Sequence, residues 1–174
     1  LCAVRGRGLS PGHGRPRGGV QPAESGGLRA SGPFLAGQGV TGGLCPVLTD
    51  APEQTLWCME QARQVIEGGP YDGAALLGIH LEGPCLSSEY KGAMPEHLLK
   101  KGSADLAASY QRQANGNIRY ITVSPEAEAV LELSPSLREL GFVVAMAPSG
   151  ADYDTAMAPI QAVTAACPPT SHPM

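Results

Sequence analysis

The sequence lacks a hydrophobic run long enough to cross a membrane, because no apolar stretch approaches the roughly 20 residues that a spanning helix needs. It also shows no apolar segment of the kind found in a secretory signal peptide. The formal net charge is −4, so the composition does not indicate non-specific binding to nucleic acid. We therefore expect neither a membrane nor a nucleic acid as a partner.

Paired cysteine motifs are missing as well. The five cysteines are Cys2, Cys45, Cys58, Cys85 and Cys167. An odd number at irregular spacing builds neither a disulfide framework nor a Cys-x-x-Cys metal site. We interpret them as buried thiols in a reducing, cytoplasmic compartment. No nucleophile-elbow, P-loop or dinucleotide-binding glycine motif occurs in the strand-and-helix context that it would need.

Residues 1–37 differ in composition from the rest of the chain. They are rich in glycine and arginine, and Glu24 is their single acidic residue. Without helical or strand periodicity, this segment cannot bury enough apolar surface to offset the entropy of ordering. We predict that residues 1–37 are disordered or lie outside the fold. The alternative is a basic arm that binds nucleic acid, but no aromatic residue is interleaved with its arginines.

From residue 38 onward, short apolar segments alternate with amphipathic ones. The pattern predicts strands at 40–48, 74–80, 118–123 and 142–146. It predicts helices at 53–67, 104–113, 125–140 and 152–162, with a further strand near Val163. This order is typical of a parallel sheet covered by helices. Length alone favours an open doubly wound sheet over part of a (β/α)8 barrel, which needs roughly 250 residues.

The most informative segment is His80-Leu81-Glu82-Gly83-Pro84, which ends an apolar strand with a carboxylate. Gly83 and Pro84 stop the strand and turn the chain. A buried carboxylate is unfavourable unless a cation or a donor meets it, and strand ends in α/β proteins are where ligands and metals bind. Glu82 is therefore the first candidate metal ligand, with a salt-bridged strand end as the alternative. His80 shares its face, either as a hydrogen-bonding neighbour or as a core histidine.

Motifs on both sides of this segment carry a resemblance to a known family. They are Gly39-Val40-Thr41, Cys45-Pro46, Lys91-Gly92-Ala93-x-Pro95, the run 121–126 and the run 143–156. Together with HLEGP they resemble the N-acetylglucosamine-6-phosphate deacetylases of the amidohydrolase superfamily. The resemblance implies that residues 38–174 are a partial amidohydrolase barrel. This α/β chain would hold about strands 2 to 6 of a (β/α)8 barrel, without strands 1, 7 and 8 and a flanking β domain.

The resemblance also implies a chemistry: hydrolysis of the N-acetyl amide of N-acetylglucosamine 6-phosphate to glucosamine 6-phosphate and acetate, in amino-sugar catabolism. Glu82 would bind the divalent metal, Zn²⁺ first, with Fe, Mn or Co as alternatives. The catalytic base, an aspartate, would lie beyond Met174. Four residues match positions that contact the substrate: Ala93, Met94, His172 and Pro173. The partners implied are this amino-sugar phosphate and, as in the full-length family, further copies in a homo-oligomer.

Two departures from the family pattern affect the same site. The family's two metal-binding histidines fall on Pro148 and Pro169, and proline has no side-chain donor atom. A catalytic zinc usually has three protein ligands, so Glu82 alone should not hold the ion. We therefore expect the chain as written to be inactive. The alternatives are a non-catalytic remnant or pseudo-enzyme, and an amidohydrolase that acts on another acyl amide.

Overall fold

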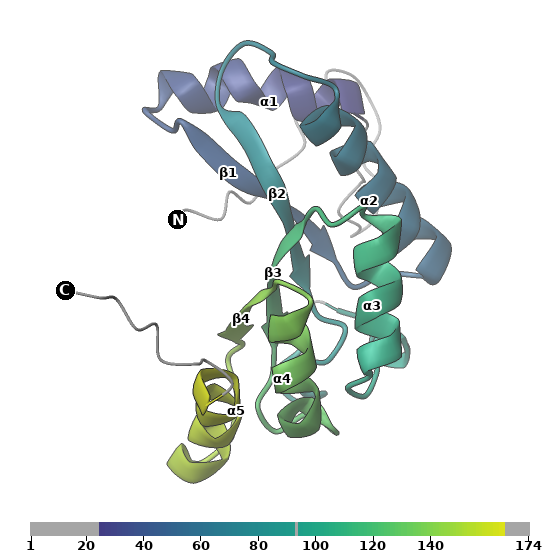
Figure 1. The fold of residues 1–174 in the computed structure, drawn as a ribbon, viewed down its shortest axis with the longest axis vertical. Helices are drawn as coiled ribbons and strands as arrows, with labels where there is room; N and C mark the ends of the chain where they lie inside the picture. The colour runs from purple at the N-terminus through teal and green to yellow at the C-terminus, as the bar shows by residue number, and fades with distance from the viewer. Residues whose placement is uncertain (1–24, 93, 166–174) are drawn as a thin grey trace, which may run out of the picture.

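The computed structural model describes residues 25–92 and 94–165 (Figure 1). Its elements in chain order are α1 (Ser25–Gly37), β1 (Gly42–Leu48), α2 (Pro52–Glu67), β2 (Ala75–Glu82), the short 3-10 helix η1 (Glu96–Leu98), α3 (Ala104–Gln113), β3 (Ile118–Val123), α4 (Val130–Glu139), β4 (Val143–Met146) and α5 (Tyr153–Ala165). Within these ranges, no helix combines the length and apolar character needed to cross a bilayer.

The four strands form a parallel sheet in the order β1-β2-β3-β4. Each strand therefore leads through a helix to its immediate neighbour, as the alternating sequence pattern predicts. Glu82, at the end of β2, is in register with Leu48 of β1 and Thr122 of β3. Because the strands are parallel, their carboxyl ends meet at one edge of the sheet, which we call the carboxyl edge. The opposite edge is the amino edge.

Toward the carboxyl ends of β1, β2 and β3, buried side chains alternate with partly exposed ones. In β2, Ile79 and Leu81 are buried, whereas His80 and Glu82 are partly exposed. The buried set joins residues of α2, α3 and α4, such as Met59, in one hydrophobic core. These three helices lie on the same side of the sheet in Figure 1. The partly exposed set, which includes Glu82, thus belongs to the other face of the sheet.

The strand-and-helix order predicted for residues 38–162 is confirmed, and two details are wrong. Val163 does not begin a strand, because it lies in α5, where the alanine-rich sequence favours helix. Residues after 165 lie outside the described part of the chain. Helix α4 begins at Val130 rather than near Glu126, and Ala129 before it has a positive φ of 62°. Residues 124–129 therefore form a loop at the carboxyl edge.

Helix α1 occupies residues 25–37, so the predicted lack of regular structure is wrong for this stretch. Leu28 packs against the core, and the guanidinium of Arg29 lies 5.6 Å from the centre of the Tyr71 ring. The carbonyl of Gly32 accepts a hydrogen bond from the Ala74 N–H at 2.9 Å. Such contacts join residues far apart in sequence, and helices in proteins depend mainly on tertiary packing. Residues 1–24 lie outside the described part.

Candidate functional site

Glu82 is the last residue of β2, where the strand meets the carboxyl edge. Its backbone carbonyl accepts hydrogen bonds from the N–H and the Oγ1 of Thr49, at 3.1 and 2.8 Å. Its side chain is partly exposed, and its carboxylate forms neither an ion pair nor a hydrogen bond among the described residues. The backbone is thus fastened to β1, while the carboxylate is left available.

The turn after Glu82 requires glycine. Gly83 has a φ of +86°, and a Cβ at this position would overlap the Oγ1 of Thr49. Its N–H donates to the carbonyl of Thr122 at 3.0 Å, so the turn is also tied to β3. Positive φ is unstrained for glycine and unfavourable for other residues. The Gly-Pro pair after the glutamate therefore ends β2 between its two neighbouring strands, in the way predicted from the sequence.

His80 lies two residues before Glu82 and contacts β3. Its Nε2 is 2.7 Å from the Oγ1 of Thr122, and its ring meets the Tyr120 ring edge-on at 4.8 Å between centroids. Burial lowers the pKa of His80, and the nearby Glu82 carboxylate partly opposes that shift. The histidine is therefore held by neighbours on the same sheet face as Glu82.

The described residues do not fit a divalent metal at Glu82. No group of three or more His, Cys, Asp or Glu side chains comes together within residues 25–92 and 94–165. Pro148 lies in the loop between β4 and α5, and its ring offers no ligand atom. Zinc and related ions need about three protein ligands for a catalytic site. The donors that the described residues offer at this edge are therefore too few to hold the ion.

Of the four residues predicted to contact substrate, the described part of the chain includes Met94. Met94 is buried, and its N–H donates to the carbonyl of Lys91 at 3.3 Å. Ala93, His172 and Pro173 lie outside the described residues, as does Pro169. Their proposed roles stay predictions.

A polar cluster at the carboxyl edge was missed in the sequence. The Gly150 N–H donates to Oε1 of Glu126 at 3.2 Å, and the Ser87 N–H donates to Oγ of Ser124 at 2.8 Å. These contacts join the loops after β2, β3 and β4. Pro125-Glu126 has the composition of a helix start, so the sequence offers no signal that the glutamate faces another loop.

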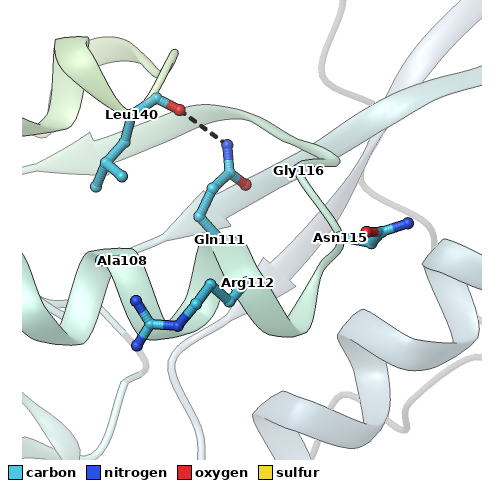
Figure 2. A pocket seen from close by; sticks show the side chains of 6 residues that line it. All are labelled: Ala108, Gln111, Arg112, Asn115, Gly116 and Leu140. Atoms are coloured by element: carbon cyan, nitrogen blue, oxygen red, sulfur yellow. Dashed lines mark hydrogen bonds between the residues drawn. The ribbon is translucent and has the colours of Figure 1, made fainter.

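Two hollows on the described surface do not have Glu82 among the residues that line them. One is lined by Ala108, Gln111, Arg112, Asn115, Gly116 and Leu140 (Figure 2). It lies at the amino edge, where α3 leads into β3. Gln111 there donates through Nε2 to the carbonyls of Ile118 and Leu140, and its Oε1 accepts from the Ile118 N–H. The Gln111 side chain therefore links α3 to β3 and to the end of α4, which is a structural role. We do not count this hollow as part of the candidate site.

Comparison with known proteins finds N-acetylglucosamine-6-phosphate deacetylases at both the sequence and the structure level. The chain is 36% identical over 129 residues to N-acetylglucosamine-6-phosphate deacetylase of Bos taurus, covering 73% of this chain and 31% of that protein. It is 31% identical over 120 residues to the Bacillus subtilis enzyme, covering 68% and 30%. No family model matches.

Solved structures agree with the sequence comparison. The crystal structure of the Mycobacterium smegmatis deacetylase matches with a TM-score of 0.63 and 28% identity, over 70% of this chain and 31% of that one. The Pasteurella multocida deacetylase matches with a TM-score of 0.60 and 26% identity. The chain thus spans 31% of the length of the first relatives it matches. With its parallel βα units fitting a fragment of a (β/α)8 barrel, the chain is a partial relative of the N-acetylglucosamine-6-phosphate deacetylases.

Proposed function

We propose that the parent activity of this chain is hydrolysis of the N-acetyl amide of N-acetylglucosamine 6-phosphate, a non-peptide C–N bond. The observation that supports this most directly is the place of Glu82. It ends β2 at the carboxyl edge, within the HLEGP motif, with its carboxylate free of partners among the described residues. In barrel enzymes of many chemistries, the active site lies at this edge. The compartment that we propose is the cytoplasm.

We further propose that the chain as written does not catalyse this reaction, because Pro148 and Pro169 stand where the family has metal-binding histidines. The purified 174-residue chain, saturated with Zn²⁺ and then desalted, should retain less than about a tenth of an equivalent of zinc. It should release no glucosamine 6-phosphate from the substrate. Bound zinc close to one equivalent, with steady amine release, would show that other residues complete the site.

The role of Glu82 can be tested by restoring the two ligand positions. The double variant Pro148→His/Pro169→His should gain measurable zinc, because three ligands then surround one ion. Glu82→Gln in that background should abolish the gain, since an amide is a poor ligand for this ion. Glu89→Gln, an exposed glutamate in the loop after β2, is the matched control and should leave zinc uptake unchanged. Equal uptake with and without Glu82→Gln would refute the assignment.

A non-catalytic remnant is the second candidate, and Pro148 is the observation that favours it. A remnant should show no chemical-shift change on addition of N-acetylglucosamine 6-phosphate, and its double-histidine variant should stay free of zinc. A third candidate, an amidohydrolase for another acyl amide, predicts that the double variant binds zinc and hydrolyses other acylated amines faster than the sugar phosphate. Metal analysis separates the first two candidates, and a panel of acyl amides separates the third.

A further inference from the structure

The carboxylate of Glu126 lies where loops from neighbouring strands meet. Its Oε1 accepts the Gly150 N–H, whereas its Oε2 is fully buried and makes no hydrogen bond of standard geometry within the described residues. Burial raises the pKa of this carboxyl, but donors outweigh burial and lower it: its own backbone N–H, the hydroxyls of Ser149 and Ser87, and the Gly150 N–H. Glu126 is therefore a partly exposed residue with one buried carboxylate oxygen and with donors around the charge.

In the loop between β4 and α5, hydrogen bonds hold the backbone at Ala147 and at Gly150. The Ala147 N–H donates to the carbonyl of Val123, at the end of β3, at 2.7 Å. Three residues later, the Gly150 N–H donates to Glu126. Position 148 lies between these two anchors, and both anchors belong to the segment that ends β3. The side chain of Glu126 is thus the second of two attachments that set the path of the loop.

The same loop is confined from the other side. A Cβ on Gly150 would lie 2.6 Å from the Tyr90 ring, so a larger residue there would require that ring to move. Tyr90 belongs to the loop after β2, as does Ser87, whose N–H donates to the buried Oγ of Ser124. At Gly150, the loop that carries position 148 therefore meets both a carboxylate and an aromatic ring.

We propose that Glu126 is a positioning residue, which fixes the loop carrying position 148 at the carboxyl edge through its bond to the Gly150 N–H. Hydrogen bonds with a charged acceptor are stronger than neutral ones. The inference rests on the proposed function in one respect, which is that position 148 belongs to the catalytic site of the family. The attachment itself does not depend on a metal or a substrate.

Amide hydrogen exchange of the full 174-residue chain, resolved for Gly150, tests this proposal. Glu126→Asp keeps the charge but is one methylene too short to reach, so exchange at Gly150 should accelerate roughly tenfold or more. Glu126→Ala should do the same. Glu126→Gln keeps an oxygen at the same reach, so it should restore the rate to within about threefold of the unsubstituted chain. Glu128→Ala, an exposed glutamate in the same loop, should change nothing.

Exchange at Ile121, a buried residue inside β3, separates local loosening from general unfolding. The proposal expects the ratio of the Gly150 rate to the Ile121 rate to rise in the Asp and Ala variants and to be rescued by Gln. Unchanged ratios in those two variants, or a Gln variant as fast as Ala, would overturn it. Because no metal or substrate is present, failure of the deacetylase proposal would leave this result untouched.

Discussion

The two edges of the sheet use polar side chains differently. At the amino edge, Glu67 accepts hydrogen bonds from Asn115 and Asn117 and also pairs with Arg63, while Gln111 makes three hydrogen bonds to backbone groups. At the carboxyl edge, the Glu82 carboxylate has no partner within the described ranges, and one oxygen of Glu126 is buried without a standard hydrogen bond.

The difference indicates that polar side chains at the amino edge stabilise the fold, whereas the Glu82 carboxylate at the carboxyl edge is free to contact a ligand. In (β/α)8 barrels, the loops before the strands serve stability and the loops after them serve function. The amino edge here follows the first rule, since its polar groups are satisfied. The carboxyl edge keeps the carboxylates that the proposed site would use, although our proposal places prolines, Pro148 and Pro169, at its two histidine positions. Mutations at the two edges should therefore have different effects on stability.

The largest effect is expected from Gly73→Ala at the amino edge. Gly73 has a φ of +103°, and a Cβ there would overlap the backbone of Gly32 and Pro33 in α1. Backbone strain and overpacking together should lower the free energy of unfolding by about 3 kcal/mol or more. Urea denaturation measures this change. Gly69→Ala is the control, because Gly69 also has a positive φ of +83° but open space around its Cβ position; it should lose only about 1 kcal/mol. Equal losses would show that the packing of α1 contributes nothing.

A smaller loss is expected from Gln111→Ala, which removes the bonds from α3 to Ile118 and Leu140. The Ile118 backbone is buried, so its N–H would be left without a partner. The free energy of unfolding should fall by about 2 kcal/mol. Gln113→Ala, at an exposed position of the same helix, should change it by less than about 0.5 kcal/mol. Similar losses for the two variants in urea denaturation would contradict the role given to Gln111.

The pH dependence of stability provides a third test. The Asn115 side chain, followed by Asn117 and Arg63, lowers the pKa of Glu67 below its ordinary value of 4.5 despite an opposing effect of burial. Because the folded-state pKa is lower than the unfolded one, the stabilisation is fully present above the ordinary value and is lost as pH falls through the folded value. Glu67→Gln should therefore lower the Tm at pH 7 and have less effect at pH 3. Glu53→Gln, at the opposite end of α2, is the control. A Tm difference of equal size at both pH values would contradict this account.

The smallest effect is expected at the carboxyl edge itself. Glu82→Gln should change the free energy of unfolding by less than about 0.5 kcal/mol, because the carboxylate has neither a hydrogen bond nor an ion pair to lose among the described residues. Urea denaturation beside the unsubstituted chain measures it. A loss above about 1 kcal/mol would mean that the carboxylate stabilises the fold, and the contrast between the two edges would disappear.

Local patterns in the sequence were enough to predict the strands and the helices that join them. Apolar runs bounded by Gly83-Pro84 or Asn115-Gly116 mark strand ends, because glycine and proline leave few alternatives to a turn. The same reasoning predicted that Glu82 ends a strand, which β2 confirms; its role as a ligand stays a prediction. Helix α1 was missed because contacts such as Gly32 with the turn at Gly73 leave no periodic trace in the sequence.

The sequence by itself determined the order of the elements and the resemblance to the deacetylases, because each of these depends on residue type and spacing. Only the tertiary structure decided which polar side chains are satisfied and which are not. Hydrogen bonds between Glu126 and Gly150, or between Glu67 and Asn115, join residues that are separated by 24 and 48 positions. Such pairs come together only when the parallel strands align, so their chemistry is set by the folded chain.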